Sequence, residues 1–138
     1  MQDPISTTLL VIDALQKAGA SYLIGGSLAS TVHGIARATM DADLVSDITP
    51  EQVPNFARNL GSAFYADIPS IQNSIRIEQS FNIIHHDSMF KVDIFPLGKQ
   101  PYDQTEFQRR QQEMVLRNPP TTAFVASPED TILSKLVW

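Results

Sequence analysis

Apolar and polar residues follow two different periods along the first part of the chain. From residue 5 to 18, apolar residues recur at helical spacing, and Gly19 follows where a helix commonly ends. Short apolar runs at 21–24 and 41–45 have the length and composition of strands. A glycine pair separates the first strand from residues 27–32, so the pattern predicts a helix, a strand, a second helix and a second strand.

The middle of the chain continues this alternation of helices and strands. Thr49 and Pro50 are typical of a helix start, with a capping threonine and proline at the first position, and Gly61 is typical of its end. A short strand at 63–66 and a short helix at 68–77 are expected to follow.

A β-hairpin is predicted after these elements. Segments 80–86 and 89–96 are rich in β-branched and aromatic residues, and only Asp87 and Ser88 separate them. A two-residue gap between two such runs is typical of a tight turn between antiparallel strands.

The last third of the chain predicts two helices around another pair of strands. Residues 102–112 are expected to form a polar helix, and 114–117 and 121–126 are expected to be strands. Ser127 then begins a helix, with proline next and acidic residues in its first turn. No stop signal precedes Trp138, so we expect a longer parent protein whose C-terminal helical part is absent.

Composition fits one α/β (or α+β) domain over residues 1–138, because strands interleave with helices in a chain of ordinary domain size. The net charge of -5 argues against a basic coat for nucleic acid or membranes. The chain has no cysteine, which excludes disulfides and thiolate chemistry. No apolar run approaches the ~20 residues of a membrane helix, and no signal peptide is present, so we expect a soluble cytoplasmic protein.

Three carboxylates are the candidate chemical centre. Asp41 and Asp43 lie two apart on a predicted strand, so they project from one face about 7 Å apart at ~3.3 Å per residue. Asp93 alternates with apolar neighbours on a later strand and faces away from them. If the two strands were neighbours, the three acids would meet, and their mutual repulsion would call for hard divalent cations such as Mg²⁺ or Mn²⁺.

A glycine turn is the second candidate feature. Gly25, Gly26 and Ser27 stand between a strand and a helix, where backbone N–H groups can approach phosphate closely. Neither feature is specific alone, because Asp-x-Asp pairs usually mark half-exposed strands and glycine pairs are often plain turns. The dinucleotide fingerprint and the Walker A loop are both excluded by the missing glycine and lysine.

Together, these motifs resemble the DNA polymerase β-like nucleotidyltransferase superfamily. The matching features are the Gly25-Gly26-Ser27 turn, the Asp41-x-Asp43 pair fourteen positions after Ser27, and a third acid, Asp93, on another strand. From about residue 20 to the end, the fuller string is most similar to the AbiEii/MenA-type toxin branch and related uncharacterised nucleotidyltransferases. The resemblance implies a mixed β-sheet with helices on one face and acids on the other.

The resemblance also implies an activity. The chain is expected to move NMP from an NTP, such as ATP, to an acceptor hydroxyl, with two Mg²⁺ or Mn²⁺ ions held by Asp41, Asp43 and Asp93. Asp93 would hold the ion nearer the acceptor and could accept its proton. The acceptor is expected to be RNA, such as a tRNA 3′ end, with a protein hydroxyl second, and an antitoxin is a possible partner.

Several cations have two open interpretations. Arg37 would reach the triphosphate or brace the aspartate pair, and Lys135 would bind phosphate or be a solvated helix lysine. Lys91 shares the predicted face of Asp93 but is expected to be solvated. Arg109 and Arg110 are expected on a solvated helix face, as weak candidates for nucleic-acid phosphates.

A rival hypothesis is a non-catalytic nucleotide-binding or scaffold domain with a vestigial site. The intact acids favour an enzyme, whereas a missing C-terminal helical part favours an inactive chain.

Overall fold

The computed structural model describes residues 4–25, 41–117 and 120–125. The helices of this part are α1 (Pro4–Lys17), α3 (Val53–Leu60), α4 (Ile68–Arg76) and α5 (Pro101–Gln108), with short 3₁₀ turns η1 (Pro50–Gln52) and η2 (Gly61–Ala63). The strands are β1 (Tyr22–Gly25), β2 (Asp41–Ser46), β3 (Phe64–Tyr65), β4 (Phe81–His85), β5 (Lys91–Pro96), β6 (Gln111–Arg117) and β7 (Pro120–Val125).

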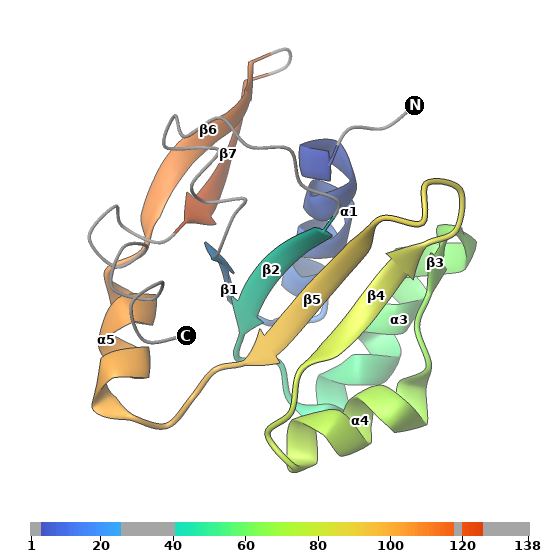
Figure 1. Ribbon diagram of the computed structural model, residues 1–138, viewed down its shortest axis with the longest axis horizontal. Helices are drawn as coiled ribbons and strands as arrows, with labels where there is room; N and C mark the ends of the chain where they lie inside the picture. Colours follow the sequence, from blue (N-terminus) through green and yellow to red (C-terminus); the bar gives the residue numbers. More distant parts are fainter. Residues whose placement is uncertain (1–3, 26–40, 118–119, 126–138) are drawn as a thin grey trace.

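One mixed sheet contains all seven of these strands, in the order β3-β4-β5-β2-β1-β7-β6 (Figure 1). The pairs β2–β5 and β1–β7 are parallel, and the other neighbouring pairs are antiparallel. The neighbouring strands β2 and β5 are far apart in sequence, with β3, β4 and two helices between them. The predicted α/β class with a mixed sheet is therefore confirmed.

The two faces of the sheet differ in what covers them. On one face, α1, α3 and α4 pack over a continuous apolar core, in which Ala42, Leu44, Val92 and Ile94 are fully buried. These four residues alternate along β2 and β5 with half-buried or exposed ones, as a one-sided strand requires. The prediction of helices on one face thus holds for α1, α3 and α4. The remaining helix, α5, stands apart from them and packs onto the other face through Phe107.

Local signals set the ends of the first helices as predicted. Gly19, with φ of 90°, follows α1, and Gly61, with φ of 73°, ends α3. Both angles lie in the left-handed region that glycine adopts without strain. At the start of the helical segment that contains α3, the N–H of Thr49 donates to the side-chain oxygen of Gln52 at 2.9 Å.

The hairpin between β4 and β5 is confirmed, but the predicted two-residue turn is wrong. The backbone N–H of His85, at the end of β4, donates to the carbonyl of Phe90 at 2.9 Å. Four residues lie between His85 and Phe90, so the turn is longer than two residues. Tight two-residue turns need residues that accept positive φ, and Asp87-Ser88 is a poor match. Here Met89 takes the positive φ, at 58°, and the ring of His85 contacts the Ser88 hydroxyl at 2.8 Å.

The predicted end of the helix over 102–112 is wrong, because the helix is shorter. Helix α5 stops at Gln108, and Gln111 and Gln112 instead pair with Val125 and Phe124 of β7. Strand β7 offers an open edge, and cross-strand hydrogen bonds override the weak local preference of a polar segment.

Other predictions lie outside the described residues, namely the helix at 27–32 and the helix that begins at Ser127. Among the helices that the structure does describe, none is both long and apolar enough to cross a membrane.

Candidate functional site

A single row of residues crosses four neighbouring strands at the centre of the sheet. Gly25 on β1 lies opposite Asp43 on β2, Asp43 lies opposite Asp93 on β5, and Asp93 lies opposite Asn82 on β4. Directly opposed residues project from the same face of a sheet. The end of the glycine strand and two of the three predicted acids are therefore aligned, on the face that α1, α3 and α4 leave uncovered.

The strand pairing that the sequence analysis required is confirmed. Neighbouring strands lie about 4.8 Å apart, so the side chains of Asp43 and Asp93 start about that far from each other. Both residues are half-buried, while Ala42 and Val92 beside them point into the core and are fully buried. Two carboxylates on one half-buried face repel each other when both are ionised.

Asp41 extends this arrangement along β2. Its backbone pairs with Lys91, which is exposed and lies on the same face as Asp93. The side chain of Asp41 is outside the described set. Gly26, Ser27, Arg37 and Lys135 also lie outside the described residues, so their assigned roles stay predictions.

The donor atoms that are described suit a hard divalent cation. Carboxylate oxygens are the ligands that Mg²⁺ and Mn²⁺ prefer, and this face has two side by side. No group of three or more His, Cys, Asp or Glu within the described part of the chain is arranged to hold a metal ion. Asp41, whose side chain is not among those described, is the predicted third ligand.

Arg110 contradicts the expectation of a solvated arginine pair. Its guanidinium lies over two rings, 4.3 Å from the centroid of Phe107 and 4.6 Å from that of Phe124. It also donates to the carbonyl of Phe107 at 2.7 Å. Arg109 is exposed, as predicted. Arg110 therefore joins α5 to β7 and does not stand on a solvated helix face.

Tyr22 on β1 also contacts Phe124 of β7. Its hydroxyl oxygen accepts the backbone N–H of Phe124 at 2.9 Å, and the two rings meet edge to face with centroids 5.9 Å apart. Burial raises the pKa of the Tyr22 hydroxyl, although the hydrogen bond from Phe124 and the positive charge of Arg110 act in the opposite direction. This contact fixes β7 beside β1.

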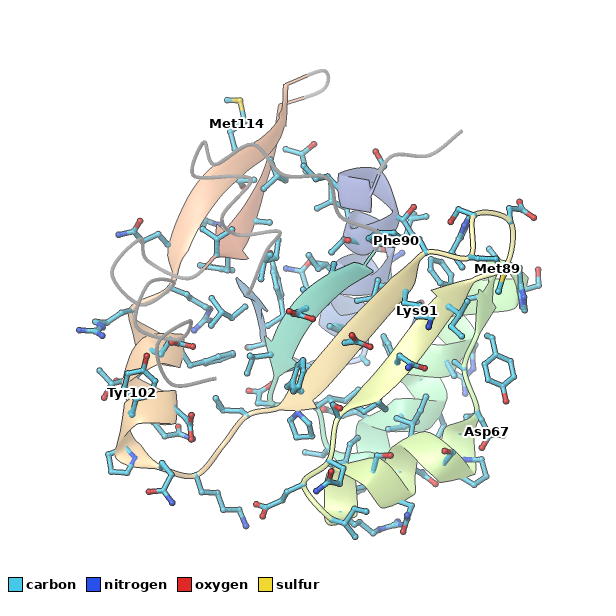
Figure 2. The ribbon with its side chains drawn as sticks, in the orientation of Figure 1. Asp67, Met89, Phe90, Lys91, Tyr102 and Met114 are labelled. Carbon is cyan, nitrogen blue, oxygen red and sulfur yellow. The ribbon has the colours of Figure 1, made fainter. Side chains whose placement is uncertain are left out.

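A pocket next to the acids was not predicted from the sequence. It lies on the acid face between the sheet and α5, which carries Tyr102, Asp103 and Glu106 into its lining. In Figure 2, Tyr102 lies on α5 to the left of the central strands, and Lys91 lies at the start of β5. The only sequence signal was the run of polar residues on α5, which does not reveal that the helix packs on this face.

The fold resembles that of a solved structure from Thermotoga maritima, described as a "putative nucleotidyltransferase". The two structures have a TM-score of 0.61 and 14% sequence identity, and the match covers 96% of this chain and 82% of that one. No protein-family model matches the chain, and no curated protein matches it. The likeness shows a shared fold, which agrees with the nucleotidyltransferase-type core that the motifs implied.

Proposed function

We propose that this chain is a metal-dependent nucleotidyltransferase that moves a nucleoside monophosphate from an NTP to an acceptor hydroxyl. The observation that carries the proposal is the row in which Gly25, Asp43 and Asp93 lie opposite one another on three neighbouring strands. It joins a glycine turn suited to phosphate with two carboxylates suited to cations. The shared fold with a structure described as a "putative nucleotidyltransferase" supports the same activity.

Asp43 and Asp93, with Asp41 two positions earlier on β2, are the residues that would hold the two Mg²⁺ or Mn²⁺ ions. The fit rests on the half-buried pair of carboxylates, whose repulsion a divalent cation would offset. When bound, such ions neutralise charge that develops on the attacking and leaving oxygens.

The residues of the chain then act mainly by positioning. Gly25, Gly26 and Ser27 would hold the β- and γ-phosphates, assisted by Arg37 and Lys135. The acceptor oxygen attacks the α-phosphorus and forms a new P–O bond, while the bond to the bridging oxygen breaks and pyrophosphate leaves. Asp93 accepts the hydroxyl proton. Holding the two reactants in line supplies much of the rate.

Two acceptors follow from the resemblance. The AbiEii/MenA-type branch favours RNA, such as a tRNA 3′ end, together with a toxin role and an antitoxin partner. A protein hydroxyl is the second candidate. The described face favours a non-RNA acceptor, because Asp103 and Glu106 lie close to the acid row and would repel phosphates.

The proposal is tested by following the label from each of the four NTPs. The protein is incubated with Mg²⁺ or Mn²⁺, NTP labelled at the α- or γ-phosphate, and either total tRNA or a protein lysate. Transfer of the α-label but not the γ-label is the expected result. Absence of transfer, together with a stabilisation of about 2.7 kcal/mol at ~100 times the Kd of an NTP, would instead support a non-catalytic nucleotide-binding domain.

A further inference from the structure

The pocket between the sheet and α5 has an apolar wall and an acidic rim. Its volume is about 200 Å³. Leu23, Val45 and Phe95 line it from the sheet, and Tyr102, Asp103 and Glu106 line it from α5. None of the described lining residues is a lysine or an arginine. The pocket therefore combines a surface for carbon with two groups that attract positive charge.

The sheet wall of the pocket lies next to the row of acids on the same face. Leu23 on β1 pairs with Val45 on β2, and Val45 pairs with Phe95 on β5. This row lies two residues along the strands from the row of Gly25, Asp43 and Asp93. It faces the same way, about 7 Å away at ~3.3 Å per residue.

The direction of the strands decides which side of the acids the pocket occupies. Strand β1 runs from Tyr22 to Gly25, so Gly25 stands at the end of β1 that lies away from Leu23 and the pocket. In an in-line displacement, the attacking and leaving oxygens lie on opposite sides of the phosphorus. With pyrophosphate held at the glycine turn, the attacking hydroxyl approaches from the pocket side.

We propose that this pocket binds the acceptor and selects one that carries a positive charge. This inference rests on the proposed transferase function and names its substrate class. The apolar wall packs against the carbon part of the acceptor, while Asp103 and Glu106 attract an ammonium or guanidinium group. The acceptor hydroxyl then points to Asp93, gives up its proton there, and forms the new bond to the α-phosphorus as pyrophosphate leaves.

The two carboxylates are placed by different contacts. Glu106 accepts a hydrogen bond from the Tyr102 hydroxyl at 3.2 Å. Asp103 lies against Gly98, where a Cβ added to the glycine would overlap its carboxylate. Gly98→Ala thus displaces the Asp103 carboxylate without removing its charge, and it complements Asp103→Asn and Glu106→Gln.

Two sources of the cationic acceptor are separated by the choice of probe. The first probe is a peptide with one serine flanked by lysines, and the second is the amino sugar glucosamine. Each is compared with its N-acetylated, neutral form, and total tRNA is included as the polyanionic alternative. Transfer of the α-label from NTP is measured with the wild-type chain, with the double variant Asp103→Asn/Glu106→Gln, and with Gly98→Ala.

Removing two charge-assisted contacts should raise the KM for the preferred cationic acceptor by about 10-fold or more. The KM for NTP should stay within about 2-fold. Glu51→Gln is the matched control, because Glu51 is an exposed carboxylate outside the pocket lining. Gly98→Ala should raise the acceptor KM in the same direction. Melting curves show that each variant is folded.

The outcomes separate this inference from the proposed function. Efficient transfer to tRNA but to neither cationic probe would overturn the inference and leave the transferase function standing. An acceptor KM that is unchanged in both the double variant and Gly98→Ala, or equal use of the acetylated probes, would also overturn it. No transfer to any acceptor, with no stabilisation by Mn²⁺ and NTP, would refute both.

Discussion

Asp43 of β2 lies directly opposite Asp93 of β5, in a parallel strand pair whose other face is fully buried. Strand β2 is the central strand of the sheet, and β5 is its neighbour. Two carboxylates this close each raise the cost of ionising the other, and a divalent cation bound between them would offset that repulsion.

Replacing either acid should remove metal-linked stabilisation. With Asp43→Asn or Asp93→Asn, Mn²⁺ plus NTP should no longer raise the melting temperature, and label transfer should fall by at least about 100-fold. Melting curves recorded without metal show that each variant is folded. Glu51→Gln should retain both responses. A variant that still gains stability from Mn²⁺ and NTP would contradict the role of that acid.

Tyr22→Phe should destabilise the protein by about 1–3 kcal/mol near pH 8. The substitution keeps the ring contact with Phe124 but leaves the N–H of Phe124 without its acceptor. Urea unfolding of the two proteins measures the difference. Equal unfolding free energies would show that the hydrogen bond contributes nothing.

The same pair of proteins should differ in pH dependence. Because burial raises the pKa of Tyr22 above 10.0, its stabilising effect is complete below about pH 10 and is lost as pH rises through the higher folded-state value. The difference in unfolding free energy between wild type and Tyr22→Phe should therefore shrink as the pH rises above 9.5. A difference that instead widens as the pH rises would mean that folding lowers the pKa of Tyr22.

Arg110→Ala should cost about 1–2 kcal/mol, since the guanidinium lies over the rings of Phe107 and Phe124 in a half-buried position. Arg109→Ala is the matched control, and its smaller effect reflects the exposed position of that side chain. Urea unfolding of both variants is the measurement. Equal losses from the two substitutions would mean that the ring contacts of Arg110 are not stabilising.

Ser88→Ala should destabilise the β4–β5 hairpin by about 1 kcal/mol. The Ser88 hydroxyl contacts the ring of His85 at 2.8 Å and accepts the N–H of Phe90 at 3.2 Å, so it supports the turn from both sides. Ser80→Ala, at an exposed position just before β4, is the control. Faster hydrogen exchange at residues 85–90 in Ser88→Ala alone is the expected local signature.

Sequence patterns were sufficient where one residue type decides the local structure. The alternation around Asp93 correctly predicted which residues enter the core, because a one-sided strand must place every second side chain there. Glycines predicted the ends of α1 and α3 for a similarly local reason. The neighbouring positions of β2 and β5 came from the resemblance, since no local property of either strand specifies its partner.

Predictions were wrong where distant contacts decide the outcome. Gln111 and Gln112 were expected in a helix, but β7 supplies hydrogen-bond partners for a strand. Arg110 was expected in solvent, but Phe124 brings a second ring to it from residues that follow later in the chain. The pocket beside α5 was missed for the same reason, because the polar sequence of the helix does not show which face of the sheet it will contact.

The central claim is that Asp43 and Asp93 jointly hold a divalent cation beside a bound NTP. The most direct measurement is anomalous diffraction at the manganese edge, from crystals of the protein grown with Mn²⁺ and a non-hydrolysable NTP analogue. We predict an anomalous peak within coordination distance of both carboxylates, with the triphosphate running from it toward Gly25. Manganese bound elsewhere, or a well-ordered pair of carboxylates with no peak between them, would contradict the account.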